Sequence, residues 1–133
     1  MKILLATALL WSIVAVAQSA PAAQSDAPVI GTWEGESVCQ VPKPCTTEHV
    51  IYEIKQDVAG KLTIVADKVV DGVRQWMGTL NCDWSSSAQR LSCPMEGGRP
   101  GLWVFDLMND TLIGTAKTND DDKVFRKINV KRK

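Results

Sequence analysis

The sequence is poor in the residues on which most enzymes and metal sites depend. It has one histidine, His49, among 133 residues, which excludes a metal site built from several histidines. Its 15 Lys and Arg balance 15 Asp and Glu, so no excess charge would draw the chain toward nucleic acid or an anionic membrane. No stretch has the 3.6-residue periodicity of an amphipathic helix. The length has room for one domain and excludes a large multi-step enzyme.

The sequence offers few residues in arrangements that suit catalysis. With one histidine, only a Ser/His/Asp arrangement drawn from distant segments could use His49 as a base, and no Gly-x-Ser-x-Gly motif is present. The acidic run at 119–122 lacks the glutamate of a calcium-binding loop and suits a hairpin turn. We therefore predict that the protein acts by binding and not by catalysis, with no cofactor and no metal.

The N-terminal segment has the features of a secretion signal. After a short positive start, Ile3–Ala17 is an apolar run of about 15 residues, shorter than the ~20 that a membrane span needs. Small residues at Ala15 and Ala17 suit signal peptidase. The pattern predicts a signal peptide over 1–17, a flexible leader over 18–28 and a folded domain over 29–133. Cleavage after Ala23 is an alternative to cleavage before Gln18.

Four cysteines follow the predicted signal peptide: Cys39, Cys45, Cys82 and Cys93. An even number in a secreted chain predicts two disulfides, with three possible connectivities. The pair 82 and 93 flanks a polar turn, and the pair 39 and 45 encloses a short loop with two prolines, so the spacing favours these two bridges. The spacings differ from the C-x2-C of typical zinc sites.

The remaining sequence alternates apolar and polar residues between turn residues, which is typical of β-strands. The expected strands are Thr32–Cys39, Glu48–Lys55, Lys61–Lys68, Val73–Trp84, Arg90–Met95, Leu102–Met108, Thr111–Lys117 and Lys123–Lys131. Eight such strands form either a closed barrel or a two-sheet sandwich. Because every connection is short, we predict an all-β fold, an eight-stranded antiparallel up-and-down barrel.

Two of these strands carry a family signature. The first reads Gly31-Thr32-Trp33, and the last contains Arg126. A Gly-x-Trp opening strand with an arginine on the closing strand resembles the lipocalins and the wider calycin group, although avidin-like barrels also open with Gly-Thr-Trp. The resemblance implies that Trp33 plugs one end of the barrel and that Arg126 lies across its indole. In size and disulfides the chain is also similar to small barrels that inhibit proteases and lysozymes in the bacterial periplasm.

The aromatic residues are the candidate binding site. Tyr52, Trp76, Trp103 and Phe105 could line a cavity in the barrel, because apolar ligand sites commonly use aromatic side chains. Filling the core is their alternative role, since eight strands leave room for side chains or one small ligand. The leading hypothesis is a secreted, periplasmic, monomeric carrier or sensor of a small apolar ligand.

The loop between Cys39 and Cys45 supports a second hypothesis. Its residues Pro42, Lys43 and Pro44 are held in a stiff closed loop, and preorganisation lowers the cost of inserting a loop into a partner. The alternative function is therefore inhibition of a secreted hydrolase, a protease or a lysozyme.

Overall fold

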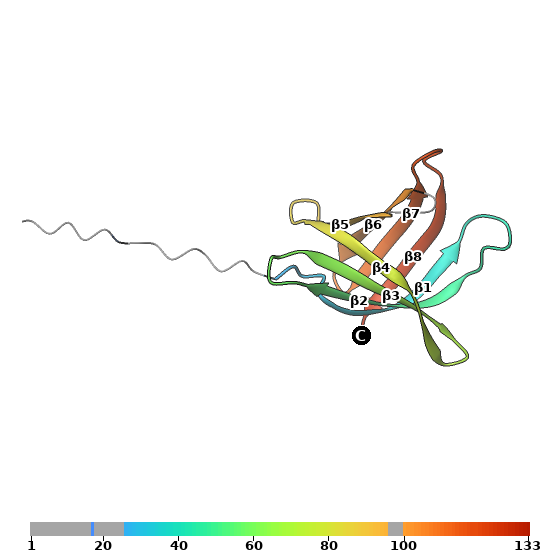
Figure 1. Cartoon of the computed structure of the whole chain (residues 1–133), viewed down its shortest axis with the longest axis horizontal. Coiled ribbons are helices and arrows are strands. Elements are labelled where there is room, and N and C mark those ends of the chain that lie inside the picture. The colour runs from blue at the N-terminus through green and yellow to red at the C-terminus, as the bar shows by residue number, and fades with distance from the viewer. Residues whose placement is uncertain (1–16, 18–25, 96–99) are drawn as a thin grey trace, which may run out of the picture.

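A computed structural model describes residue 17 and residues 26–95 and 100–133 (Figure 1). Of the predicted signal peptide the structure describes residue 17 alone, and of the predicted leader it describes residues 26–28. The strands are β1 (Gly31–Cys39), β2 (Glu48–Gln56), β3 (Leu62–Val70), β4 (Val73–Ser85), β5 (Arg90–Met95), β6 (Gly101–Met108), β7 (Thr111–Thr118) and β8 (Val124–Arg132). Within the described part of the chain, no helix is long and apolar enough to cross a membrane.

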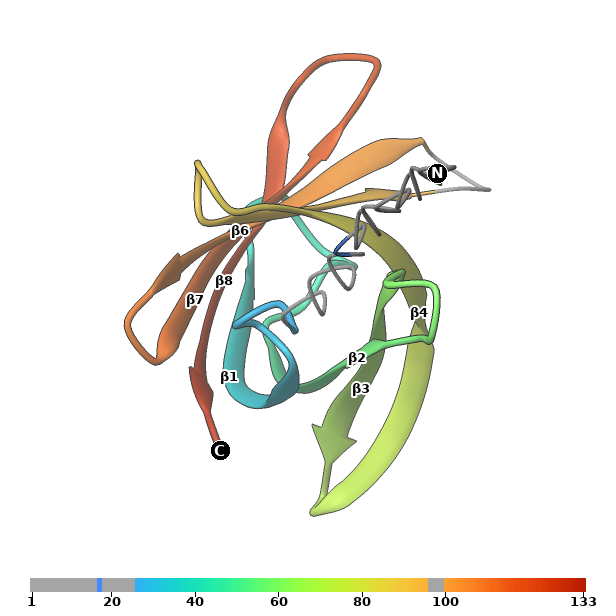
Figure 2. The same cartoon turned by 90° about the vertical axis from the view of Figure 1, so that its left-hand side faces the viewer.

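The strands form a closed barrel in chain order. Each strand pairs antiparallel with the next, and β8 returns to pair with β1. In Figure 2, β1 to β4 curve around one side and β6 to β8 lie on the other. This confirms the predicted eight-stranded up-and-down barrel, and it shows that the sandwich is not formed.

The period-two pattern explains which side chains form the core. In β2, Val50, Tyr52 and Ile54 point inward and are at most 3% exposed, whereas Lys55 is exposed. Burying apolar side chains on one face of every strand supplies the main favourable term in folding. The buried apolar core consists of Val29, Trp33, Val50, Tyr52, Ile54, Leu62, Ile64, Cys82, Leu91, Cys93, Phe105, Leu112, Ile128 and Val130.

Both predicted disulfides are present. Cys39 bridges to Cys45 with the Cα atoms 5.9 Å apart, and Cys82 bridges to Cys93 with the Cα atoms 4.2 Å apart. The first closes the loop between β1 and β2, and the second joins β4 to β5. Two disulfides are consistent with an oxidising, extracellular or periplasmic environment.

Two β-bulges interrupt the regular alternation. In β4, Gly78 lies opposite Ala66 while Trp76 lies opposite the next residue, Asp67, so Met77 is an extra residue. In β8, Phe125 is extra in the same way, because Arg126 and Val124 oppose successive residues of β7. A bulge changes which residues face inward beyond it.

The up-and-down order places the loops β1–β2, β3–β4 and β7–β8, the end of β5 and the start of β6 at one end of the barrel, which we call the loop end. The opposite end, where β1 begins and β8 finishes, we call the Trp33 end. The β3–β4 hairpin projects from the barrel in both views (Figures 1 and 2).

Trp33 is buried at the end of the barrel where β1 begins, and the arginine that covers its ring is not the one that the resemblance implied. Its indole is fully buried, and Nε1 donates a hydrogen bond of 2.8 Å to the Val29 carbonyl. The guanidinium carbon of Arg132 lies 4.3 Å from the ring centroid. The prediction that Arg126 covers Trp33 is wrong, because the β1–β8 register pairs Trp33 with Arg132 and pairs Arg126 with Cys39.

Candidate functional site

A cavity of about 310 Å³ lies at the loop end of the barrel. Its walls come from β1 to β6 and from β8. The lining residues are Ser37, Glu48, Tyr52, Ile64, Ala66, Met77, Gly78, Thr79, Leu80, Met95, Trp103, Phe105 and Arg126.

The incomplete pairing of β4 and β5 explains why space opens here. Among the described residues, the two strands pair only at Asp83–Ser92, Trp84–Leu91 and Ser85–Arg90. Beyond the adjoining Cys82–Cys93 bridge, β4 continues along β3, and β5 continues along β6. Thr79 on β4 and Met95 on β5 both line the cavity. The disulfide therefore marks the point at which the barrel wall divides.

Aromatic rings form one wall of the cavity. Phe105 lies edge-to-face with Tyr52, with the ring centroids 5.8 Å apart, and stacks with Trp103 at 6.3 Å. The Phe105 ring packs directly on Gly114, its partner in β7. A Cβ atom at Gly114 would lie only 2.6 Å from the ring, so glycine is needed for this close approach. Phe125, the extra residue of the β8 bulge, meets Trp103 edge-to-face at 6.1 Å. This wall is preformed by contacts between its own members.

Two polar atoms in this aromatic wall have no hydrogen-bond partner among the described residues: the Tyr52 hydroxyl oxygen and the Trp103 Nε1. They are the only buried side-chain nitrogen or oxygen atoms of the described chain in that condition. The Ser37 hydroxyl does not meet the geometry of a formed hydrogen bond to the phenol. Burial raises the pKa of Tyr52 well above its usual value, while the charge of Arg126 and the hydrogen-bonding influence of the nearby Ser37 hydroxyl oppose this and the charge of Glu48 adds to it. The phenol therefore stays protonated over the physiological pH range.

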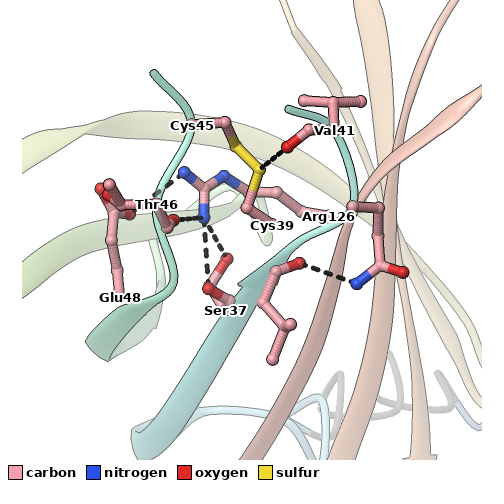
Figure 3. Close-up of a disulfide and its surroundings, with 9 residues drawn as sticks. Ser37, Cys39, Val41, Cys45, Thr46, Glu48 and Arg126 are labelled. Atoms are coloured by element: carbon pink, nitrogen blue, oxygen red, sulfur yellow. Dashed lines mark hydrogen bonds and ion pairs between the residues drawn. A yellow bond between two sulfur atoms is a disulfide. The ribbon is translucent and has the colours of Figure 1, made fainter. Parts of the chain in front are cut away.

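Arg126 forms the charged edge of the cavity, and its Nη1 is held by three oxygen atoms of the protein (Figure 3). Its Nη1 donates to the Ser37 carbonyl and hydroxyl oxygens, both at 3.2 Å, and to the Thr46 carbonyl at 3.1 Å. Its Nη2 lies 3.6 Å from Glu48 Oε2, and the two side chains are 14% and 19% exposed. The arginine thus joins β8 to β1 and to the segment after the Cys39–Cys45 bridge, and its charge is balanced by Glu48.

A larger hollow of about 630 Å³ lies at the opposite end, but its composition is less informative. Its lining comes from residues 26–28, the turn between β2 and β3 with the adjoining strand ends, the end of β4 and the turn that follows β4. Many of the lining side chains are polar and exposed, including Asp26, Lys61, Asp83 and Gln89. Neither of the two unpaired buried atoms lies there. The smaller cavity is therefore the candidate site.

The structure brings three of the four predicted site residues together. Tyr52, Trp103 and Phe105 line the cavity, whereas Trp76 is 70% exposed and lies outside it. Simple alternation would place Leu80, Gly78 and Trp76 on one inner face. The extra residue Met77 breaks this alternation, so Met77 lines the cavity and Trp76 turns outward.

Sequence reasoning also missed several members of the site. Arg126 lines the cavity and does not cover Trp33, and Ser37 and Glu48 complete its network. One signal was available: in β8, Arg126 shares the inward parity of Ile128 and Val130, which are buried. An arginine on an inner face needs partners that the alternation of its own strand cannot identify.

The loop between Cys39 and Cys45 lies outside the cavity. Pro42, Lys43 and Pro44 are all exposed, while both cysteines are partly buried. The base of the loop is held by the disulfide, by the Arg126–Thr46 hydrogen bond and by a 2.9 Å hydrogen bond from the Gln40 amide to the Phe125 carbonyl. An exposed tip on a fixed base is the arrangement expected of either a recognition loop or a simple closure of the barrel end.

No family model matches the chain, and neither a curated protein nor a solved structure matches it. The eight-stranded barrel is established by the structure itself, whereas the likeness to lipocalins remains a resemblance of the sequence signature.

Proposed function

We propose that this chain is a secreted, non-catalytic binding protein that holds one small apolar molecule in the loop-end cavity, as a carrier or a sensor. The observation that carries this proposal is the 310 Å³ cavity with its wall of Tyr52, Trp103 and Phe105. Small-molecule sites are concave, mostly apolar and largely preformed, with volumes of about 300–1,000 Å³. The cavity lies at the lower end of that range, so its ligand is a small one.

The two disulfides and the predicted signal peptide support a site of action outside the cytoplasm, and we place it in the periplasm. Disulfides persist in oxidising compartments and also stabilise small folded domains. A barrel held by two disulfides keeps its cavity formed outside the cytosol, where chaperones are fewer.

A cavity-filling variant tests the proposal. The full chain, secreted from its own host and purified without reductant, is examined by native mass spectrometry. We expect additional non-covalent mass that is lost on denaturation and is extractable into organic solvent. Ala66→Phe, which places a ring in the cavity, should abolish this mass.

Val73→Phe is the matched control, because Val73 is 61% exposed on β4 and lies outside the cavity lining. It should retain the bound mass. If Ala66→Phe does not fold, as judged by circular dichroism, Ala66→Leu is the milder substitute. Equal bound mass in a folded filling variant and in the control would contradict the proposal.

The second candidate function uses the Cys39–Cys45 loop, and its exposed, anchored tip is the observation that favours it. In that function the loop enters the cleft of a secreted protease or lysozyme and the cavity has no role. Replacing Pro42, Lys43 and Pro44 by glycine should then abolish inhibition of the target hydrolase, while Ala66→Phe leaves inhibition unchanged. The two proposals therefore predict opposite sensitivities for the same pair of variants.

A further inference from the structure

The two buried polar atoms without partners belong to the same cavity, and this coincidence defines what the cavity would recognise. Tyr52 is only 3% exposed, and both its hydroxyl and the Trp103 Nε1 lack hydrogen bonds to any described residue. Buried polar groups in folded proteins nearly always have a partner, so such exceptions need an explanation. Elsewhere in the described core, the buried Trp33 N–H is paired.

We propose that the cavity selects a neutral molecule with an apolar body and a hydrogen-bond acceptor oxygen, such as a ketone, ester or ether, which accepts from the Trp103 N–H and the Tyr52 hydroxyl. This inference rests on the proposed binding function and specifies the class of ligand.

The donor chemistry requires an acceptor. An indole N–H donates and cannot accept, and a phenol can donate to the same kind of group. A pure hydrocarbon would leave both atoms unpaired and would exclude the water that could otherwise satisfy them. An oxygen acceptor restores the missing hydrogen bonds.

The charges around the cavity favour a neutral ligand. Arg126 and Glu48 are the charged residues of the lining, and they lie within 3.6 Å of each other. Arg126 also donates to Ser37 and Thr46. Neither charge is left without compensation, so an ionic ligand would lose its hydration without gaining a counter-charge. The protonated state of Tyr52 agrees with this, since its phenol is a donor and not an anion.

The rest of the lining favours an apolar body. Phe105, Ile64 and Leu80 offer no polar side-chain atoms. The ligand oxygen would therefore be directed toward Tyr52 and Trp103, and its carbon skeleton toward Phe105, Ile64 and Leu80.

Three probes of matched size test the proposal on the full secreted chain: acetophenone, α-methylstyrene and benzoate. They have the same number of non-hydrogen atoms. The first carries a carbonyl where the second carries a methylene group, and the third carries a negative charge. Affinity is measured by isothermal titration calorimetry after extraction of any resident ligand. We expect acetophenone to bind more tightly than α-methylstyrene by at least about three- to tenfold, the factor that each well-formed neutral hydrogen bond contributes, and benzoate to bind most weakly.

Two variants identify the atoms involved. Tyr52→Phe and Trp103→Phe each remove one donor, and each should lower the affinity for acetophenone while leaving that for α-methylstyrene within about twofold, so that the preference shrinks. Trp76→Phe is the matched control, because the same substitution is made on an exposed tryptophan outside the cavity. It should leave all three affinities unchanged.

The outcomes separate the two levels of the proposal. If α-methylstyrene binds as tightly as acetophenone, the acceptor requirement is wrong while the binding function survives. If benzoate binds best, the ligand is an anion and the neutral class is wrong. If none of the three probes binds at millimolar concentration, the cavity is not a small-molecule site and both proposals fail together.

Discussion

The two ends of the barrel are built around two arginines on the inner face of the same strand, β8, yet they differ in how completely their polar groups are paired. At the Trp33 end, Arg132 stacks on the indole and donates to the carbonyls of Ile30 and Pro28 at 3.0 and 2.6 Å. At the loop end, Arg126 donates to Ser37 and Thr46, but the aromatic wall beside it retains two polar atoms that have no hydrogen-bond partner among the described residues.

The difference separates a structural end from a candidate functional end. At the Trp33 end the indole N–H has a partner, and the hollow found there has many polar, exposed lining residues and contains neither of the two unpaired buried atoms. At the loop end, the Tyr52 hydroxyl and the Trp103 Nε1 have no partner among the described residues and lie at a cavity, so they can form hydrogen bonds with a bound molecule. Four predictions test this comparison, from the largest expected effect to the smallest.

Trp33→Ala should have the largest effect on stability. It removes a fully buried ring, its hydrogen bond to Val29 and its contact with Arg132, and we expect a loss of about 3–5 kcal/mol in the free energy of unfolding. Guanidinium chloride unfolding measures this loss. Trp76→Ala, at a site that is 70% exposed, should change stability by less than about 0.5 kcal/mol. Equal losses would show that Trp33 is not the plug of the barrel.

Replacing either arginine by methionine should destabilise the protein by about 1–2 kcal/mol, because partly exposed charged hydrogen bonds contribute less than buried ones. The local effects should differ. Arg132→Met should speed exchange of the Ile30 amide, which donates to Ala27, and spare the Gln40 amide, which donates to Phe125. Arg126→Met should do the reverse. Hydrogen exchange followed by NMR measures both amides, and loss of protection at both ends in each variant would contradict the independence of the ends.

Tyr52→Phe should leave stability unchanged or raise it by up to about 1 kcal/mol, because it removes a buried hydroxyl that has no hydrogen-bond partner in the described part of the chain. The same type of edit at the other end, Trp33→Phe, removes a paired N–H and should lower stability. Urea unfolding of the two variants under the same conditions provides the measurement. A loss of more than about 1 kcal/mol for Tyr52→Phe would mean that the hydroxyl is satisfied in solution.

Alkaline titration should reveal the raised pKa of Tyr52. This is the only tyrosine in the chain, so absorbance of the phenolate after rapid mixing reports one group. The folded protein holds the phenolic proton above the ordinary pKa of 10.0, whereas the unfolded chain releases it there. The associated stability is therefore complete below pH 10 and decreases as the pH rises further. Tyr52→Phe should flatten that decrease, and phenolate absorbance appearing at the ordinary pKa in the folded protein would contradict the burial of the ring.

Most of the barrel could be predicted from local features of the sequence. The alternation of Val50, Tyr52 and Ile54 fixed an inward face for β2, and Asp71-Gly72 marked the turn between β3 and β4. The disulfide pairs also followed from short separations along the chain. These features depend on neighbours in sequence, which is why they are visible without coordinates.

The candidate site was less predictable because it depends on exceptions to the alternation. A bulge at Met77 moved Trp76 out of the predicted site, and a bulge at Phe125 placed a ring against Trp103, which lines the cavity. Nothing in the period-two pattern distinguishes an extra residue from a regular one, since a bulge forms where the pairing of two strands requires it.

The sequence by itself determined the strands, their inward faces, the hairpins and the disulfides, because strand alternation and turn chemistry act over a few residues. Tertiary structure alone decided which arginine covers Trp33 and which enters the cavity. That choice follows from the register between β1 and β8, which sets Arg132 opposite Trp33 and Arg126 opposite Cys39. The two arginines are separated by six positions, or about 20 Å of strand, and only closure of the barrel fixes which of them meets the indole.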